Sequence, residues 1–323
     1  MTHANPRTLG TGDIILRKVC PGCDSRVVGN GLPVPSFRIA ETFPCGRAVL
    51  GPDVQNMRRL MRCSTCGLLH FSHIPSQDAV KSLLDGPSSA VRWPTGNRLS
   101  YAFAREIIRQ NVPLGGQVLD VGAHNGAFLA SLGDEYRKVA LEPIESSHAA
   151  LRIQGIDVLE GFLEEVPLQA STFDCITAFD VLEHLAHPGM CLRRLAIALR
   201  PGGVLIAETG DAGSRIARLL GPAWYYLTYL EHFQAFSHES LEAVLTRSGL
   251  RAVRMDRVSR FPAQSGPMLR VATRAIAYSV AVWARSPSLW RHICETVQRG
   301  SDAAPPDTGC IEDDHLLVVA ARR

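Results

Sequence analysis

From Tyr101 onward the chain alternates short apolar runs with segments of helical spacing. The segment 101–110 places its apolar residues on one side of a helical projection, and the apolar runs that follow have the length of buried strands. Strands that alternate with helices at this spacing predict a parallel sheet covered on both faces, a doubly wound α/β architecture. The expected strands are 117–121, 138–142, 156–159, 173–179, 203–208, 250–258 and 316–321.

The N-terminal part of the chain has a different texture. Residues 1–75 contain two Cys-x-x-Cys pairs, and residues 76–100 are rich in Ser, Pro and Gly, as a linker is. We expect a small lobe over 1–75, a linker over 76–100 and a main domain over 101–323. A segment of helical texture at about 262–300 precedes the last expected strand, and we interpret it as an insertion in the main domain.

The two Cys-x-x-Cys pairs predict a structural zinc site. Each pair lets two thiolates converge on one ion from a tight turn, and four thiolates leave no open position for water. The metal would therefore stabilise the lobe and take no part in chemistry. The alternative is a set of buried or redox-active thiols, and Cys45 is a spare ligand. The expected ligands are Cys20, Cys23, Cys63 and Cys66.

Composition and charge exclude several classes of protein. The hydrophobic share of 46% and the charged share of 20% are those of an ordinary globular chain and exclude intrinsic disorder. Lys and Arg number 34 against 31 Asp and Glu, and the net charge of +3 argues against a nucleic-acid-binding protein. The sequence shows neither an apolar stretch long enough for a membrane-spanning helix nor the apolar core of a secretion signal. We therefore expect a cytoplasmic protein.

The first expected strand ends in a turn that suits a cofactor with a cationic group. Residues 120–126 read Asp-Val-Gly-Ala-His-Asn-Gly, without the Gly-x-Gly-x-x-Gly spacing of a dinucleotide site. In a doubly wound sheet the ligand binds at the carboxyl ends of the strands beside this turn. An acid just before the turn would repel phosphate and attract a cationic amino acid group. This favours S-adenosylmethionine over a nicotinamide or a flavin.

Four motifs in order resemble the class I S-adenosylmethionine-dependent methyltransferases. They are VLDVGAHNG, ALEP, STFDCITAFDVLEHL and ALRPGGVLIAE, and together they span residues 115–210. The resemblance implies a Rossmann-like, mostly parallel seven-stranded sheet, preceded here by a small zinc-ribbon-like lobe and with a helical insertion before the last strand. It also implies that the sulfonium methyl group of S-adenosylmethionine is transferred to an acceptor.

The family's cofactor roles carry over onto matching positions. The turn after the first strand lies under the methionine moiety, and the acid that ends the second strand accepts both ribose hydroxyls. Residues after the third strand enclose the adenine, and residues after the fourth face the methionine end. His124 departs from the family, in which this position is often glycine. The resemblance thus implies a cofactor site of Asp120, Gly122, Ala123, Gly126, Glu142, Phe162, Leu163, Asp180 and Leu182.

The segment after the fourth strand has two interpretations. Glu183 and His184 resemble a feature of some quinone-type O-methyltransferases, in which this segment helps to hold a divalent cation. Alternatively, residues 180–184 start a helix whose acids lie near its positive end, where they cap and pack.

A second resemblance concerns the chemistry. A four-cysteine lobe combined with Tyr229-Leu-Glu-His232 and a following Phe-Ser resembles the zinc-containing sugar C-methyltransferases, whose motif is Tyr-His-Glu-His. In that family the Tyr, Glu and His line the substrate pocket and handle protons, which implies catalytic roles for Tyr229, Glu231 and His232. The chain departs from that family at Leu230 and lacks the tyrosine-rich segment after the cysteines. The structural alternative is that His232 only fixes the loop before a helix capped by Ser237.

The expected function is methyl transfer from S-adenosylmethionine to a small molecule, with a sugar, a nucleotide-linked sugar or a secondary metabolite as the leading acceptor class. One alternative is an RNA methyltransferase that uses the cysteine lobe as a reader. Another is a non-enzymatic protein that binds S-adenosylmethionine. The segment 267–300 could form part of a lid, cover the core, mediate a homodimer contact or lie on a membrane surface.

Overall fold

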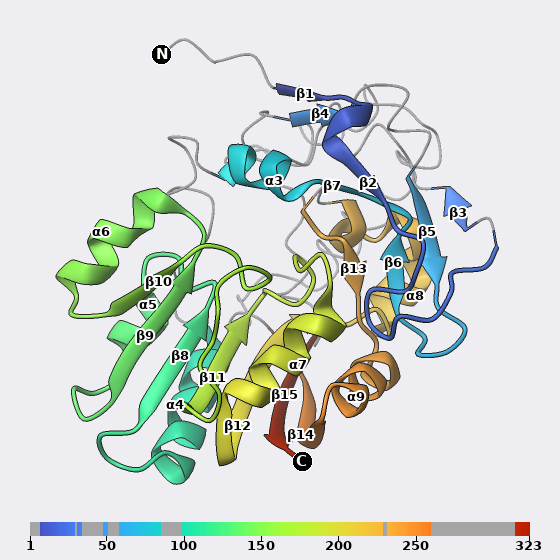
Figure 1. The fold of residues 1–323 in the computed structure, drawn as a ribbon. Helices are drawn as coiled ribbons and strands as arrows, with labels where there is room; N and C mark the ends of the chain where they lie inside the picture. The colour runs from blue at the N-terminus through green and yellow to red at the C-terminus, as the bar shows by residue number, and fades with distance from the viewer. Residues whose placement is uncertain are drawn as a thin grey trace, which may run out of the picture.

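A seven-stranded sheet forms the centre of the molecule (Figure 1). The computed structural model describes residues 7–29, 31–33, 48–50, 58–84, 98–228, 231–259 and 314–323. The strands of the central sheet are β8 (Gln117–Val121), β9 (Arg137–Glu142), β10 (Asp157–Glu160), β11 (Phe173–Phe179), β12 (Leu199–Gly210), β14 (Leu250–Val258) and β15 (His315–Arg322).

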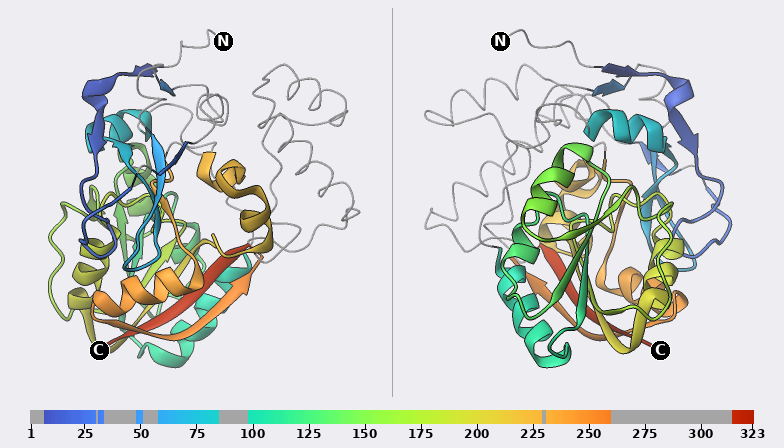
Figure 2. Two further views of the ribbon diagram at one scale, coloured as in Figure 1. Left: turned by 90° about the vertical axis from the view of Figure 1, so that its right-hand side faces the viewer. Right: turned by 60° about the vertical axis from the view of Figure 1, so that its left-hand side comes forward.

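The strand order of this sheet is β10-β9-β8-β11-β12-β15-β14. The strands from β10 to β12 are parallel, whereas β15 is antiparallel to both β12 and β14, between which it lies (Figure 2). The expected strands are all present, and the prediction of a mostly parallel, doubly wound sheet is confirmed. Because β8 lies between β9 and β11, the strand order reverses at its carboxyl end, where such sheets bind ligands.

Side chains alternate between the two faces of the sheet, and each face has its own apolar core. Val118 and Ile206 belong to one core, whereas their sequence neighbours Leu119 and Leu205 belong to the other. Both faces are therefore covered, as the apolar character of the strands requires. Helices α4 (Leu99–Asn111), α5 (Ala127–Ala130) and α6 (Glu145–Ile153) cover the first face, and α7 (Pro188–Ala198) and α9 (His238–Arg247) cover the second.

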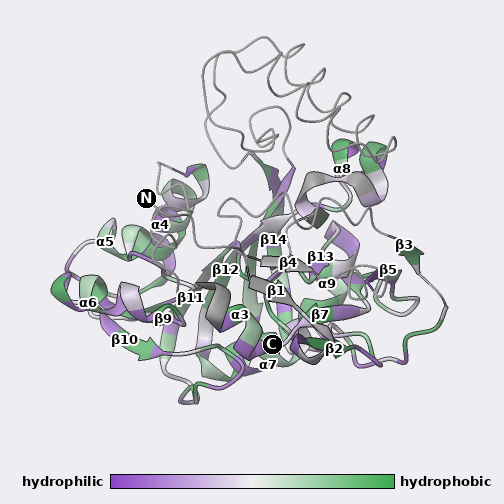
Figure 3. Cartoon of the chain, turned by 90° about the horizontal axis from the view of Figure 1, so that it is seen from above, coloured by the Kyte–Doolittle hydropathy of each residue, from purple (hydrophilic) through white to green (hydrophobic). Residues whose placement is uncertain are grey.

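The N-terminal lobe consists of short strands, of which β2, β3, β5 and β7 lie on the side of the molecule opposite α6 and β10 (Figure 3). One antiparallel sheet has the order β13-β6-β5-β3, and its edge strand β13 comes from the main domain. Strand β2 pairs with β7, and β1 pairs with β4. The strands are β1 (Arg7–Leu9), β2 (Ile14–Leu16), β3 (Leu32–Pro33), β4 (Ala48–Leu50), β5 (Arg59–Arg62), β6 (Leu69–Phe71), β7 (His73–Pro75) and β13 (Gln234–Ala235).

The connecting segments contain further helical turns. Helix α3 (Gln77–Leu84) lies within the range 76–100 that the sequence indicates as a linker, so that range is not irregular throughout. The expected insertion at about 262–300 and Cys45 lie outside the described residues, and the domain boundaries stay a prediction. Of the helices in the described part of the chain, none has the length and apolar character that a membrane crossing needs. The other turns are η1 (Thr11–Asp13), α8 (Arg215–Leu220), η3 (Gly221–Ala223) and η4 (Tyr225–Thr228).

Candidate functional site

A cavity lies at the carboxyl ends of the parallel strands. Its wall includes the turn after β8, the end of β9 and the segments that follow β10 and β11. On another side it is lined by Val80 of α3 and by Glu231 and Phe233, which precede and follow His232 just before β13. Both the main domain and α3, which follows the N-terminal lobe in sequence, therefore contribute to this cavity.

Most of the expected cofactor residues meet in this cavity. Leu182 does not line it, because its side chain is fully buried in the core beneath α7. Gly126 begins α5 behind the turn, where a Cβ atom would approach Leu151 Cδ2 to 2.8 Å, so its role is close packing. The residues that do line the cavity are Asp120, Gly122, Ala123, Glu142, Phe162, Leu163 and Asp180.

The turn after β8 has left-handed backbone at three positions, of which Gly126 immediately precedes α5. Gly122 has φ 71°, and a Cβ atom there would lie 2.9 Å from Val181 Cγ2. His124 has φ 48°, in the region that glycine adopts most readily. This backbone conformation explains why glycine is often found at this position in the methyltransferases that the sequence resembles. The backbone N–H of His124 donates to Glu142 Oε2 at 2.5 Å. The turn and the end of β9 are thereby held together.

Glu142 ends β9 as a buried carboxylate with a fixed orientation. Its side chain is 2% exposed, and its Oε1 accepts a hydrogen bond from Ile144 N at 2.9 Å, in addition to the bond from His124. Burial raises the pKa of Glu142 even though these two N–H groups favour its ionised form. Each carboxylate oxygen can accept more than one hydrogen bond, so the group fits a vicinal diol such as that of ribose.

Asp120 is the buried acid at the end of β8. It is 4% exposed, and Thr177 Oγ1 of the neighbouring strand β11 donates to its Oδ1 at 2.7 Å. Burial raises the pKa of Asp120 to about 7, with the charge of Glu142 acting in the same direction and Arg98 opposing it. A cationic ligand group beside Asp120 would favour the ionised form.

Sequence reasoning missed Arg98, which lines the cavity as a buried cation. Its Nη2 forms a salt bridge with Asp180 Oδ2, and its Nη1 lies 3.7 Å from Glu208 Oε2. Asp180 follows β11 in left-handed backbone with φ 54°, and its N–H donates to Glu208 O at 2.9 Å. No local pattern marks Arg98, because its partners are distant in sequence: Asp180 follows β11, and Glu208 lies within β12.

One histidine lines the other end of the cavity, and a second, buried histidine packs against it. His184 lines the cavity, and the ring of His232 lies against it with centroids 4.7 Å apart. Nδ1 of His184 lies 2.9 Å from Glu231 O, and Nδ1 of His232 lies 2.7 Å from Tyr226 O. Because carbonyl oxygens only accept, each Nδ1 is the donor in its contact. Tyr229, the third expected catalytic residue, lies outside the described residues.

The turn after β11 brings Glu183 and His184 together with His232. One ligand atom from each of these residues lies within 4.8 Å of the others, so the group could hold a metal ion. Thr209 Oγ1 donates to Glu183 Oε2 at 2.9 Å in the protein interior. The alternative of a helix start at 180–184 is wrong: these residues form a turn, and α7 begins only at Pro188.

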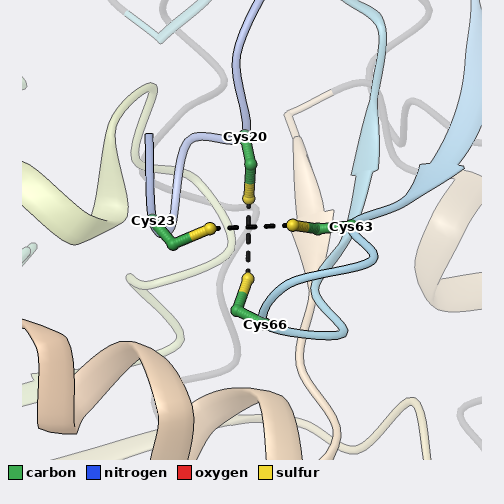
Figure 4. A group of neighbouring side chains, drawn as sticks. All are labelled: Cys20, Cys23, Cys63 and Cys66. Atoms are coloured by element: carbon green, nitrogen blue, oxygen red, sulfur yellow. Dashed lines mark hydrogen bonds between the residues drawn. The ribbon is translucent and has the colours of Figure 1, made fainter. Parts of the chain in front are cut away.

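The sulfur atoms of the two Cys-x-x-Cys pairs point toward one another (Figure 4). Cys20 Sγ lies 3.6 Å from Cys66 Sγ, Cys23 Sγ lies 3.6 Å from Cys63 Sγ, and the four sulfurs lie within 4.8 Å of one another. Metal–sulfur bonds of about 2.3 Å in a tetrahedron would separate the sulfurs by roughly 3.8 Å. The cysteines present therefore fit a closed zinc site.

Residues 97–254 match the sequence model of a family described as Methyltransferase domain. The ubiquinone biosynthesis O-methyltransferase of Xanthomonas axonopodis pv. citri is 31% identical over 133 residues, covering 39% of this chain and 54% of that protein. That of Azorhizobium caulinodans is 30% identical over 129 residues, covering 35% and 51%. The chain spans about half the length of the curated relatives it matches.

A solved structure has the same fold. It is phosphoethanolamine N-methyltransferase 2 of Haemonchus contortus in complex with S-adenosyl-L-methionine, with a TM-score of 0.50 and 14% sequence identity, covering 79% of this chain and 63% of that chain. At this identity the likeness concerns the fold alone. Together with the strand order, these matches confirm the expected Rossmann-like methyltransferase fold. Residues 97–254 of this chain are therefore similar in sequence to a methyltransferase domain, and the sheet has the corresponding fold.

Proposed function

We propose that this protein is an S-adenosylmethionine-dependent methyltransferase that acts on a small molecule. The observation that carries the proposal is the cavity in which Glu142, Asp120 and Asp180 lie at the carboxyl ends of the adjacent strands β9, β8 and β11, respectively. Three acids at one edge suit a ligand with a diol and a cationic group and disfavour a pyrophosphate. The matching methyltransferase domain supports the same conclusion.

We call the part of the cavity lined by Arg98, Asp120, Glu142, Phe162, Leu163 and Asp180 the cofactor end. Its residues fit S-adenosylmethionine. Glu142 would accept the ribose hydroxyls, and Phe162 and Leu163 would enclose the adenine. Asp120 would attract the cationic amino group, and the guanidinium of Arg98 at the same end suits the carboxylate of an amino acid. The bound cofactor supplies an electrophilic methyl group on a sulfonium centre.

We call the part of the cavity lined by His184, Leu185, Glu231 and Phe233 the acceptor end. The residues there would orient the methyl acceptor and take its proton. We propose that His232 takes the proton, that Glu231 orients the ring of His232 and that Tyr229 forms a hydrogen bond with a hydroxyl or carbonyl of the methyl acceptor. Positioning the nucleophile in line with the methyl group supplies much of the rate, and a base within hydrogen-bond reach contributes by taking the released proton. His184, which lines the cavity and contacts His232, is the other candidate for this base.

The leading acceptor class is a sugar, a nucleotide-linked sugar or a secondary metabolite. The relatives named as ubiquinone biosynthesis O-methyltransferases support a small-molecule acceptor. The four cysteines would hold a structural zinc ion. A homodimer and a cytoplasmic location stay predictions, as does the expectation that the protein does not bind nucleic acid.

Methyl transfer from labelled S-adenosylmethionine tests the proposed function. The full chain is incubated separately with nucleotide sugars, free sugars, phenolic compounds and bulk tRNA, and S-adenosylhomocysteine is measured. We expect turnover with a small-molecule class and none with tRNA. Methylated tRNA would support the RNA methyltransferase instead. Stoichiometric cofactor binding without turnover on any acceptor would support the non-enzymatic alternative.

A further inference from the structure

The segment 231–236, which contains two of the proposed catalytic residues, is bonded to the N-terminal lobe. Strand β13 pairs with β6, so that Gln234 lies opposite His70. The N–H of Phe71 donates to Phe233 O at 2.9 Å. The segment therefore extends a sheet of the lobe, although it follows the main-domain strand β12 in sequence.

Arg17 of the lobe reaches into the main domain at this point. It directly follows β2, and its side chain is buried, with 6% of the residue exposed. Its Nη1 donates to Phe233 O at 3.1 Å, and its Nη2 donates to Ala186 O at 2.6 Å and to Gln234 Oε1 at 3.0 Å. The guanidinium thus bonds the turn after β11 and the segment before β13 at the same time.

Gln234 strengthens the same connection from the other side. Its fully buried amide Nε2 donates to Leu182 O at 2.6 Å and to Leu185 O at 2.8 Å, while its Oε1 accepts from Arg17. The oxygens that accept from Arg17 and from Gln234 are all uncharged carbonyl oxygens. The contact therefore fixes the relative positions of the two segments and does not pair opposite charges. A rigid planar fork is suited to such a role, because its donors point in fixed directions.

Both of the bonded segments line the acceptor end of the cavity. The turn after β11 contributes His184 and Leu185, and the other segment contributes Glu231 and Phe233. If either segment moved, the buried guanidinium of Arg17 would lose hydrogen-bond acceptors. Because unpaired buried donors of a charged group cost free energy, the arrangement seen is strongly favoured. The spacing of the two segments therefore depends on a side chain of the lobe.

We propose that Arg17 is a positioning residue through which the cysteine lobe sets the distance between segments 182–186 and 231–236. The lobe is then a part of the acceptor end rather than an attached module. That these segments serve an acceptor rests on the proposed function, whereas the positioning itself does not.

An exposed ion pair offers a matched control. Arg193 of α7 also contacts the lobe, through its Nη2 at 3.3 Å from Asp24 Oδ2, but the two side chains are 42% and 63% exposed. Exposed pairs of this kind contribute little to stability. Replacing Arg193 removes an arginine between the lobe and the main domain without touching the two segments.

Hydrogen exchange followed by mass spectrometry tests the proposal on the full chain. In Arg17→Met we expect exchange in segments 182–186 and 231–236 to accelerate at least about tenfold, with little change in the strand and turn over 117–126. Arg17→Lys should give an intermediate increase, because one ammonium group cannot span all of the acceptors. Arg193→Met should leave both segments as in the unmodified chain.

Imidazole nitrogen NMR provides a readout that general loss of stability would not reproduce. In the unmodified chain and in Arg193→Met, His184 should be the Nδ1–H tautomer, as its contact with Glu231 O requires. In folded Arg17→Met the contact loosens, and a mixture of tautomers is expected. Titration with S-adenosylhomocysteine should give affinities for the unmodified chain and for Arg17→Met that agree within about threefold, because Arg17 is not part of the cofactor end.

Unchanged exchange in both segments of folded Arg17→Met would overturn the proposal, as would an equal increase over the whole chain. If Arg17→Met does not fold, Arg17→Lys decides: a local increase supports the positioning role, and none contradicts it. Failure of the unmodified chain to bind S-adenosylhomocysteine would count against the proposed function only, since the exchange pattern is measured without any ligand.

Discussion

The two ends of the cavity are built in different ways. The cofactor end comes from consecutive strand ends, and its acids Asp120, Glu142 and Asp180 each end or directly follow a strand of one parallel sheet. The acceptor end is assembled from the turn after β11 and the segment before β13, and β13 pairs with strand β6 of the N-terminal lobe. The geometry of the cofactor end thus depends on the sheet, whereas the geometry of the acceptor end depends on how the main domain and the N-terminal lobe pack. Changes to the lobe should therefore affect the acceptor end selectively.

Loss of the metal site should have the largest effect. Cys63→Ser removes one thiolate of the set, and the apparent free energy of structural zinc binding is on the order of 10 kcal/mol. We expect the metal content to fall from close to one equivalent per chain and the lobe to lose its structure, with faster hydrogen exchange at 231–236 as well. The cofactor end should retain its affinity for S-adenosylhomocysteine. Elemental analysis and calorimetric titration measure both effects.

The same substitution at Cys191, which is buried in α7 and does not belong to the group of four converging cysteines, is the control for the metal site. Cys191→Ser should keep the metal. Metal-free protein with an intact lobe, or Cys63→Ser with a full equivalent of metal, would show that the four cysteines do not form a zinc site.

Replacing His232 should affect the acceptor end alone. We expect His232→Ala to keep its melting temperature and its affinity for S-adenosylmethionine while the turnover rate falls roughly 10²–10⁴-fold, the range of a general base. His184→Ala tests the cavity-lining histidine in the same assay. A His232→Ala protein that turns over at the original rate would end the catalytic role, and one that unfolds would favour the loop-fixing role. Activity that disappears on removal of divalent cations would favour the cation-binding interpretation of Glu183 and His184.

A smaller, pH-dependent effect is expected at the cofactor end. Burial raises the pKa of Asp120 to about 7, above the roughly 3.9 of an unfolded chain, so folding takes up a proton between these values. Stability contributed by this group is therefore present at low pH and is lost as the pH rises through about 7. Relative to Asp120→Asn, the unmodified chain should lose on the order of a few kcal/mol of unfolding free energy between pH 4 and pH 8.

Denaturant unfolding at several pH values measures this loss. The control is Asp157→Asn, at an exposed position at the start of β10, which should leave the pH dependence as it is. A pH profile of Asp120→Asn that coincides with that of the unmodified chain would mean that Asp120 does not titrate in this range.

The sequence predicted the cofactor end because its determinants are local. Apolar runs identified the strands, and an acid at the end of a parallel strand must lie at the ligand-binding edge wherever the strand is placed. Leu182 was an exception, since its burial beneath α7 depends on how the turn after β11 runs. The turn itself was harder to predict because residues 180–184 have the composition of a helix start.

The acceptor end depends on contacts that the sequence does not mark. Arg17 and Phe233 are bonded although they lie 216 positions apart, and Arg98 pairs with Asp180 across 82 positions. Neither arginine stands in a motif, and a buried arginine is not distinguishable from a surface one by composition. The Tyr-Leu-Glu-His segment was found through a resemblance, but its pairing with β6 needed the structure.

Calorimetric titration of the full chain with S-adenosylhomocysteine tests the central claim most directly. Glu142→Ala is the test variant, and Glu160→Ala is its control, because Glu160 also ends a strand but is 53% exposed and pairs with Arg152 outside the cavity. Hydrogen bonds to a charged group contribute about 1.5–3 kcal/mol each, so Glu142→Ala should bind at least tenfold more weakly than the unmodified chain and Glu160→Ala equally well. An unmodified chain that does not bind, or Glu142→Ala with unchanged affinity, would contradict the account.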